Sequence, residues 1–283
     1  MLIRQAPAKI NLGLAVHGRR SDGYHDISTI FLKISLADVL CLEEIPREIV
    51  VHCDHPDVPS DARNLVYRAA ALLQPLAAGR GVRLHLQKAI PVAAGLGGGS
   101  SDAAATLLGL NTLWNLHLSR EALLQYAARL GADVPFFVLP DVAALGRGRG
   151  DILEPLATIP ECSFVVVNPR LAVSTAWAYG QLTFGLTAQV NNTNILRQYL
   201  ESGDFASLGK TFFNDLEHAV LPQFPEVQEV KRALDHPGVY GVCMSGSGPT
   251  VYALCASPAA AQEVAAVARR RAWDVWVCRS WRV

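Results

Sequence analysis

The chain has no excess charge of either sign, because 25 lysine and arginine residues are matched by 25 aspartate and glutamate residues. It also lacks a long basic stripe, so we expect no nucleic-acid partner. No unbroken apolar run reaches the roughly 20 residues of a transmembrane helix, so no membrane partner is expected either. Hydrophobic residues nevertheless make up 51% of the chain. This share can bury a large core and excludes a disordered or fibrous protein.

The six cysteines lack the spacing of a metal site or a disulfide framework, since they are scattered and contain no CxxC pair. We expect reduced thiols in apolar surroundings, which suits the cytoplasm. The first residues, Met1 to Pro7, lack the charged and apolar regions of a signal peptide. This start also favours a cytoplasmic protein.

Hydrophobic periodicity predicts strands and helices along the whole chain of 283 residues. Strands are expected over residues 10–16, 27–32, 82–86, 164–167 and 273–278, and as a strand-loop-strand unit around Gly246 to Gly248. Helices are expected over residues 64–73, 119–131, 174–182, 194–200, 227–234 and 258–270, and from the glycine-rich segment to about residue 114. Prolines at positions 155 and 160 suggest a boundary. We therefore predict an α+β protein with two domains, residues 1–155 and 156–283.

The most informative segment is the run Gly95-Leu96-Gly97-Gly98-Gly99, which leads through Ser100 and Ser101 into a predicted helix. Glycines let backbone N–H groups approach an anion, and the start of a helix adds unpaired N–H groups, so the segment predicts a phosphate site. Ser100, Ser101 and Asp102 are candidates for the N-cap. The lysine that a Walker A loop requires is missing, and a dinucleotide fingerprint needs glycine where Ser100 stands. A flexible loop or a tightly packed helix entry is the structural alternative.

Three segments resemble the motifs of the GHMP kinase superfamily, in the same order: Pro7 to Leu12, Pro91 to Ser101 and Met244 to Thr250. Together with Arg20 to His25 and Leu130 to Phe136, they are similar to the 4-diphosphocytidyl-2-C-methyl-D-erythritol kinase family. Its members use ATP to phosphorylate the 2-hydroxyl of a cytidine-diphosphate-linked methylerythritol, in the non-mevalonate route to isoprenoid precursors. The resemblance implies a ribosomal-protein-S5-domain-2-like N-terminal domain and a ferredoxin-like C-terminal domain.

The resemblance also implies which residues bind the nucleotide. ATP is expected to contact residues of the glycine loop, namely Pro91, Gly95, Leu96, Gly97, Gly98, Gly99, Ser100 and Ser101. Phosphoryl transfer uses Mg²⁺, which the hydroxyl of Ser100 or Ser101 is expected to reach. Asn64, Leu65 and Lys88 are placed near the nucleotide. Their alternative roles are a helix cap, a core leucine and a solvated lysine at a strand end.

Two residues are expected to be catalytic. The resemblance makes Asp133, at the start of a short predicted helix with Pro135 in its first turn, the base that accepts the proton of the alcohol. Lys9 is expected to orient Asp133 and to neutralise charge on the transferred group. The structural alternatives are an N-cap aspartate and an exposed lysine at a strand end.

The acceptor is expected to bind through Asp133 and through five further residues. Tyr24 and Tyr179 offer two rings between which a cytosine can stack, and His25 can bond to its edge. Asn11 and Thr175 can bond to the diol or the diphosphate. As alternatives, Tyr24 is an ordinary turn aromatic, Tyr179 packs a helix face, and His25 is structural.

Two further segments have predicted roles. A turn at Gly246 and Gly248 is expected to lie against the first glycine loop, whereas Arg147 and Arg149 are expected to be solvated. We expect a cytoplasmic monomer or weak homodimer that acts on a small molecule. Two alternatives remain: another GHMP-type kinase, for homoserine or a mevalonate-like alcohol, and a catalytically silent nucleotide-binding sensor.

Overall fold

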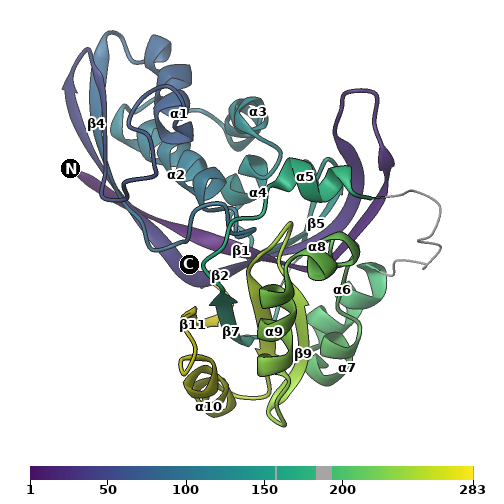
Figure 1. The fold of residues 1–283 in the computed structure, drawn as a ribbon. Helices are drawn as coiled ribbons and strands as arrows, with labels where there is room; N and C mark the ends of the chain where they lie inside the picture. The colour runs from purple at the N-terminus through teal and green to yellow at the C-terminus, as the bar shows by residue number, and fades with distance from the viewer. Residues whose placement is uncertain (157, 183–192, 283) are drawn as a thin grey trace. The chain divides into compact units, whose positions relative to one another are not determined.

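The computed structural model of the chain describes residues 1–156, 158–182 and 193–282 (Figure 1). The chain divides into two compact units, and neither is a single run of sequence. The first unit comprises Met1–Ala8, Leu36–Val92 and Gly97–Pro140, and the second comprises Lys9–Ser35, Ala93–Leu96 and Asp141–Val283. The two long strands β1 (Leu2–Arg19) and β2 (His25–Pro46) each contribute residues to both units. The predicted boundary at residues 155 and 156 stays a prediction.

The first unit packs helices on a small sheet. Strand β4 (Arg80–Gln87) pairs antiparallel with the second half of β2 and parallel with β3 (Ile49–Cys53). The helices of this unit contact one another: α1 (Leu65–Leu73), η1 (Gln74–Leu76), α2 (Gly98–Leu113), α3 (Arg120–Leu130) and α4 (Val134–Val138). Gly109 of α2 lies so close to β2 that a Cβ there would meet the Leu42 side chain at 2.8 Å. Small residues therefore allow α2 to lie directly on the sheet.

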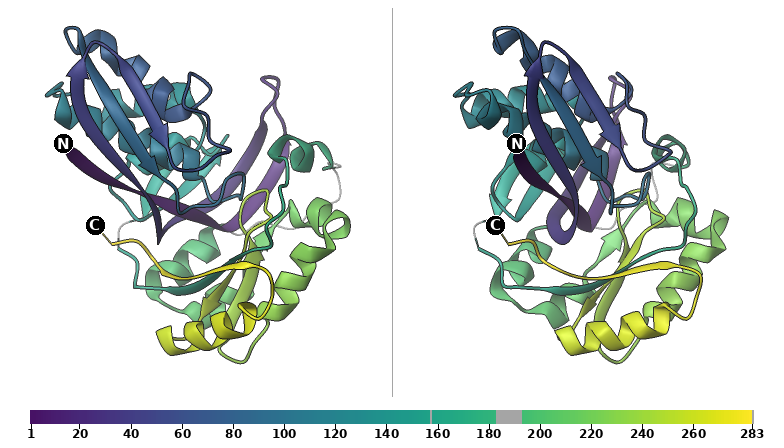
Figure 2. Two further views of the ribbon diagram at one scale, coloured as in Figure 1. Left: turned by 60° about the vertical axis from the view of Figure 1, so that its left-hand side comes forward. Right: turned by 90° about the vertical axis from the view of Figure 1, so that its left-hand side faces the viewer.

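The second unit contains a four-stranded antiparallel sheet in the order β11-β7-β10-β9. Its strands are β7 (Ser163–Asn168), β9 (Val239–Met244), β10 (Val251–Cys255) and β11 (Asp274–Arg279). Helices α9 (Pro225–Leu234) and α10 (Pro258–Ala268) contact each other and the sheet, as the views in Figure 2 show for α10 in yellow. Two helices on an antiparallel sheet agree with the predicted ferredoxin-like part.

The remaining strands of the second unit pair with its portions of β1 and β2 or with one another. Residues Ile27–Leu32 of β2 pair with β5 (Ala143–Gly148), which pairs with β6 (Ile152–Leu156). Strand β1 pairs in parallel with β8 (Phe213–Asn214). The other helices of this unit are α5 (Thr175–Gly180), α6 (Thr193–Ser202), α7 (Phe205–Lys210) and α8 (Glu217–Gln223). No helix in the described part of the chain is long and apolar enough to cross a membrane.

Most elements lie where the sequence predicts them, but the first two strands are far longer than expected. They span 18 and 22 residues because polar side chains such as Lys9, Asn11 and Lys33 are buried within them and interrupt the apolar alternation. Four of the six cysteines, Cys162, Cys243, Cys255 and Cys278, are buried as expected, whereas Cys41 and Cys53 are half-buried.

Candidate active site

Helix α2 begins inside the glycine run, one turn earlier than the N-cap candidates imply. Its N-cap is Gly97, whose φ of 70° lies in the left-handed region that glycine adopts without strain. The predicted caps at Ser100, Ser101 and Asp102 are therefore wrong, since these residues lie within the first turns of the helix. Because glycine has no side chain, no capping group competes for the first N–H groups of α2. These N–H groups suit an anion.

The two serines after the glycines differ in their exposure. Ser100 is half-buried, whereas Ser101 is 1% exposed. The hydroxyl oxygen of Ser101 has no hydrogen-bond partner among the described residues. A buried polar oxygen without a partner is costly, which points to a ligand that supplies the missing contact.

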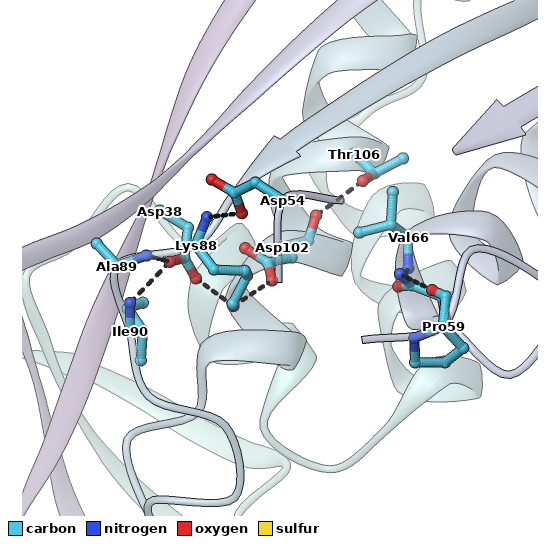
Figure 3. A network of polar contacts seen from close by, with 10 residues as sticks. Asp38, Asp54, Pro59, Val66, Lys88, Ala89, Ile90, Asp102 and Thr106 are labelled. Atoms are coloured by element: carbon cyan, nitrogen blue, oxygen red, sulfur yellow. Dashed lines mark hydrogen bonds and ion pairs between the residues drawn. The ribbon is translucent and has the colours of Figure 1, made fainter. Parts of the chain in front are cut away.

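Lys88 lies at the centre of a buried ionic cluster, which is shown in Figure 3. Its ammonium group contacts Oδ2 of Asp38 at 2.5 Å and Oδ2 of Asp102 at 2.8 Å, and its side chain is only 5% exposed. The other oxygen of Asp38 accepts the backbone N–H groups of Ala89 and Ile90, at 2.6 and 2.8 Å. The cluster therefore ties the end of β4, and the chain leading to Pro91, to the first turns of α2.

The cluster holds two carboxylates and one ammonium group, and this imbalance shifts their pKa values. Burial raises the pKa of Asp102 to about 7, although Lys88 opposes the shift. Burial alone would lower the pKa of Lys88, but the charges of Asp102 and Asp38 outweigh it and raise that pKa. Lys88 is therefore not the solvated lysine of the structural alternative. It lies beneath the glycine run, because a Cβ at Gly98 would meet its Nζ atom at 3.3 Å.

Asn64 and Leu65 lie at the start of α1, and Leu65 lies beside the same glycine run. Asn64 caps this helix, since its Oδ1 accepts the N–H of Val66 at 2.9 Å while its Nδ2 donates to the Pro59 carbonyl at 2.7 Å. Its alternative role as a cap is confirmed. Leu65 is only half-buried, so it is not a core leucine, and a Cβ at Gly99 would lie 3.8 Å from its Cδ1 atom.

Asp133 is the residue before the short helix α4, as predicted, with Pro135 in the first turn. Its carboxylate makes no capping hydrogen bond to the helix, and the residue is half-buried. Asp133 thus occupies the N-cap position of α4 without a capping hydrogen bond from its side chain.

In the second unit, Lys9 lies within β1 and is only 4% exposed, so the exposed strand-end alternative is wrong. Its ammonium group donates to Oδ1 of Asn11 at 2.6 Å and lies 5.3 Å from the centre of the Phe31 ring. The Asn11 amide nitrogen donates to Oγ1 of Thr29 at 2.8 Å. A buried cation is thus held by a neutral amide.

The turn around Gly246 lies against the beginning of the glycine loop, as predicted. The Ser245 hydroxyl donates to the Gly95 carbonyl at 3.0 Å, and a Cβ on Gly95 would lie 2.2 Å from the carbonyl oxygen of Ser245. Gly95 also has a φ of 74°, so only glycine fits there. On the other side, the N–H of Lys9 donates to the Leu96 carbonyl at 2.9 Å. Strand β1 and both turns are therefore locked together.

The candidate acceptor residues of the second unit gather in two groups. The rings of His25 and Tyr179 stack with centroids 4.9 Å apart and planes at 28°. Burial, and then the charge of Arg19, lowers the pKa of His25, which favours a neutral imidazole able to accept a hydrogen bond. The hydroxyl of Thr175 lies 2.8 Å from that of Ser247, so α5 is bonded to the Gly246 turn.

Tyr24 is 51% exposed, and its ring has the Arg149 guanidinium 4.9 Å from its centre. Arg149 is held by Asp151, with nitrogen–oxygen distances of 2.6 and 2.9 Å. The prediction that Arg149 is solvated is therefore wrong, because its side chain packs on an aromatic face and is fixed by a carboxylate. Arg147, with a side chain 52% exposed and 3.5 Å from Glu154, agrees better with the prediction.

The sequence patterns missed the contacts of several polar residues, including Thr29, Asp38 and Ser247. For Asp102, the sequence predicts only an N-cap role at the start of α2. Polar residues inside apolar strand patterns were the one available signal, since Thr29 and Asp38 both lie within β2 and both are 0% exposed.

Comparison with known proteins agrees with this geometry. Residues 64–140 match the family model of the GHMP kinases N terminal domain, and residues 196–274 match that of the GHMP kinases C terminal. A relative from Exiguobacterium sibiricum, named 4-diphosphocytidyl-2-C-methyl-D-erythritol kinase, is 45% identical over 89% of this chain and 88% of its own length.

Two solved structures are also similar. A crystal structure of 4-(cytidine 5'-diphospho)-2C-methyl-D-erythritol kinase has a TM-score of 0.83 and 38% identity, covering 99% of this chain and 100% of that one. A homoserine kinase from Cytophaga hutchinsonii has a TM-score of 0.75 at 21% identity, covering 99% of this chain and 94% of that one. The second match shows the shared fold alone.

Proposed function

The chain belongs to the 4-diphosphocytidyl-2-C-methyl-D-erythritol kinase family of the GHMP kinases, and we propose that it transfers the γ-phosphoryl group of ATP to the 2-hydroxyl of 4-diphosphocytidyl-2-C-methyl-D-erythritol. It is an ATP-dependent small-molecule kinase of the two-domain GHMP fold, and it serves the non-mevalonate pathway to isoprenoid precursors. The observation that carries the proposal is the start of α2, where a glycine N-cap leaves the first N–H groups open to an anion.

At the nucleotide end, the N–H groups of the glycine loop bind the phosphates of ATP, with the loop held in place by the Lys88 cluster. Leu65 and Asn64 lie beside the loop and contact the nucleoside. Hydroxyl and carboxylate oxygens suit Mg²⁺, and the unpartnered oxygen of Ser101 fits such a ligand, with Ser100 as its more exposed neighbour. When bound, Mg²⁺ supplies positive charge that stabilises the phosphates.

At the reacting end, Asp133 accepts the proton of the 2-hydroxyl. Lys9 neutralises negative charge on the transferred group, and its burial makes that charge effective because few water molecules screen it.

At the acceptor end, the cytosine stacks on Tyr24 and Tyr179, and His25 bonds to its edge. Asn11 and Thr175 bond to the methylerythritol or the diphosphate. The support for this assignment is that one face of Tyr24 is covered by Arg149 while the residue is 51% exposed, so the ring is fixed but open to a ligand. Stacking of a base on an aromatic ring contributes roughly 1–3 kcal/mol per contact.

A coupled assay of ADP release tests the function. We expect ADP with 4-diphosphocytidyl-2-C-methyl-D-erythritol, and none above background with homoserine or mevalonate. ATP binding without ADP release from any alcohol would instead indicate a sensor. Cytidine diphosphate should compete with the acceptor, and a lack of competition would favour another GHMP-type kinase.

The proposal also covers the cellular location and the oligomeric state of the protein. We assign the enzyme to the cytoplasm as a monomer or a weak homodimer. Fractionation of cells that express the tagged protein, and sedimentation of the pure protein over a range of concentrations, test the two assignments.

A further inference from the structure

We propose that Thr29 is a positioning residue for phosphoryl transfer: its hydroxyl fixes the orientation of the Asn11 amide, and that amide holds the ammonium group of Lys9. The inference rests on the proposed function through the role of Lys9. Thr29 lies on β2, whereas Lys9 and Asn11 lie on β1.

The three side chains form one buried chain of hydrogen bonds. Lys9 is 4% exposed, Asn11 2% and Thr29 0%. The Thr29 hydroxyl donates to the Gly13 carbonyl at 2.6 Å and accepts the Asn11 amide nitrogen at 2.8 Å. Oδ1 of Asn11 then accepts the Lys9 ammonium group at 2.6 Å.

The direction of this chain follows from the number of protons available. A hydroxyl has one proton, and the Gly13 carbonyl, which can only accept, takes it. The oxygen of Thr29 therefore accepts a hydrogen bond from its other neighbour, so the NH₂ group of Asn11 must face it. This leaves Oδ1 facing Lys9. In the flipped amide, two donors would face each other at Lys9, and the arrangement would lose its buried hydrogen bond.

The backbone of Asn11 is fixed separately from its amide. The hydroxyl of Tyr252, which is fully buried, donates to the Asn11 carbonyl at 2.8 Å. Removing the Thr29 hydroxyl should therefore release the orientation of the amide while β1 stays in place. The substitution should then change the orientation of the Asn11 amide that holds Lys9, without unfolding the strand.

The test is Thr29→Val, which keeps the shape of the side chain but removes its hydroxyl. We expect kcat to fall about 10- to 100-fold while the KM of ATP stays within about twofold of the wild type, because the Lys9 interaction acts in the transition state. Thr29→Ser, which keeps the hydroxyl, should restore kcat to within about threefold of the wild type. An equal loss of kcat in Thr29→Val and Thr29→Ser would overturn the inference.

A double-mutant cycle separates positioning from a merely structural role. If Thr29 acts through Asn11, then Thr29→Val should not lower the residual kcat further in an Asn11→Ala background. An equal fractional loss in both backgrounds would exclude the coupling. If Thr29→Val does not fold, Thr29→Ala is used in the same cycle.

Thr211→Val is the matched control. Thr211 ends α7 and donates from its hydroxyl to the Leu208 carbonyl at 2.8 Å, so the same chemical change removes a hydrogen bond away from Lys9. It should lower the melting temperature and leave kcat unchanged.

A readout that does not require activity keeps this inference distinct from the proposed function. In NMR spectra of the ¹⁵N-labelled protein, the side-chain amide signals of Asn11 should shift in Thr29→Val and return in Thr29→Ser. If the wild type released no ADP, the proposed function would fail while this measurement still decided the Thr29–Asn11 contact. Unchanged Asn11 signals in Thr29→Val would refute the contact itself.

Discussion

Lys9 and Lys88 show how the surroundings of a residue decide its role. Both ammonium groups are shielded from solvent, but Lys88 contacts two carboxylates whereas Lys9 donates to the neutral amide of Asn11. The ion pairs with Asp38 and Asp102 hold the ammonium group of Lys88 beneath Gly98, so the role of Lys88 is to fix the glycine loop. The hydrogen bond to Oδ1 of Asn11 orients the ammonium group of Lys9, which is the part of the side chain that we propose to face a phosphate.

Asp133→Asn should remove most of the turnover and leave ATP affinity nearly unchanged, because the base acts on the alcohol and not on the nucleotide. Urea unfolding of the variant separates a loss of turnover from a loss of stability. Measurements of kcat, the Kd of ATP and urea unfolding check these outcomes.

Ser119→Ala is the control for Asp133→Asn, since the Ser119 hydroxyl caps α3 by accepting the N–H of Ala122 at 3.3 Å. It should cost about 1 kcal/mol of unfolding free energy without loss of kcat. A wild-type rate in Asp133→Asn would remove Asp133 from the mechanism.

The buried cluster predicts a pH dependence of stability. The pKa of Asp102 is about 7 in the folded protein and 3.8 as its ordinary value, so between these values the folded state binds more protons than the unfolded state. The free energy of unfolding should therefore fall as the pH rises from about 4 to 7.

Asp102→Asn should flatten this slope, which urea unfolding at several pH values measures. The comparison variant is Asp54→Asn, since Asp54 accepts the backbone N–H of Lys88 at 2.9 Å and does not take part in the ion pairs of Lys88 with Asp38 and Asp102. A steeper fall in Asp102→Asn than in the wild type would contradict the assignment.

At the scale of elements, the two glycine turns act as a pair. A residue with a Cβ at position 95 would have both a left-handed φ and a contact of 2.2 Å with the Ser245 carbonyl oxygen. The long strand β1 is bonded to the same loop through Lys9 and Leu96. The loop is thus held from two sides before any ligand binds, which reduces the entropy that binding must overcome.

Gly95→Ala should be far more destabilising than Gly79→Ala. Gly79 has a φ of 83° but nothing within 4 Å of its Cβ position, so only the backbone strain of about 1–2 kcal/mol applies there. Gly95→Ala should lose about 1 kcal/mol or more of unfolding free energy in addition, because its Cβ displaces the turn at Ser245. Thermal unfolding compares the two variants, and equal losses would show that the close approach does not matter.

At the scale of the whole molecule, ATP should stabilise the folded chain because it binds that state alone. At a concentration 100 times its Kd, the gain is about 2.7 kcal/mol. Asp133→Asn should show the same gain, whereas Gly97→Ala, which places a Cβ at a φ of 70° in the N-cap of α2, should show a smaller one. Differential scanning calorimetry with and without ATP measures both. An equal gain in Gly97→Ala would argue against a phosphate site at this helix start.

The order of the elements, the glycine loop, the candidate base and the family all follow from the sequence. These features depend on residues close together along the chain: apolar spacing within one helix or strand, glycine where the backbone needs a left-handed φ, and motifs a few residues long. Asp133 before Val134 and Pro135 is such a local pattern, and the structure places the helix start there.

The tertiary structure alone decided which polar groups meet. Asp38 and Lys88 are 50 positions apart, and Asn11 and Thr29 are 18 apart, so no local pattern pairs them. The start of α2 at Gly97 also had to be observed, because several neighbouring residues are acceptable caps and only packing selects among them. A buried lysine, asparagine or threonine looks in sequence like a break in a strand, and its hydrogen-bond partner, supplied by a distant strand, gives it its role.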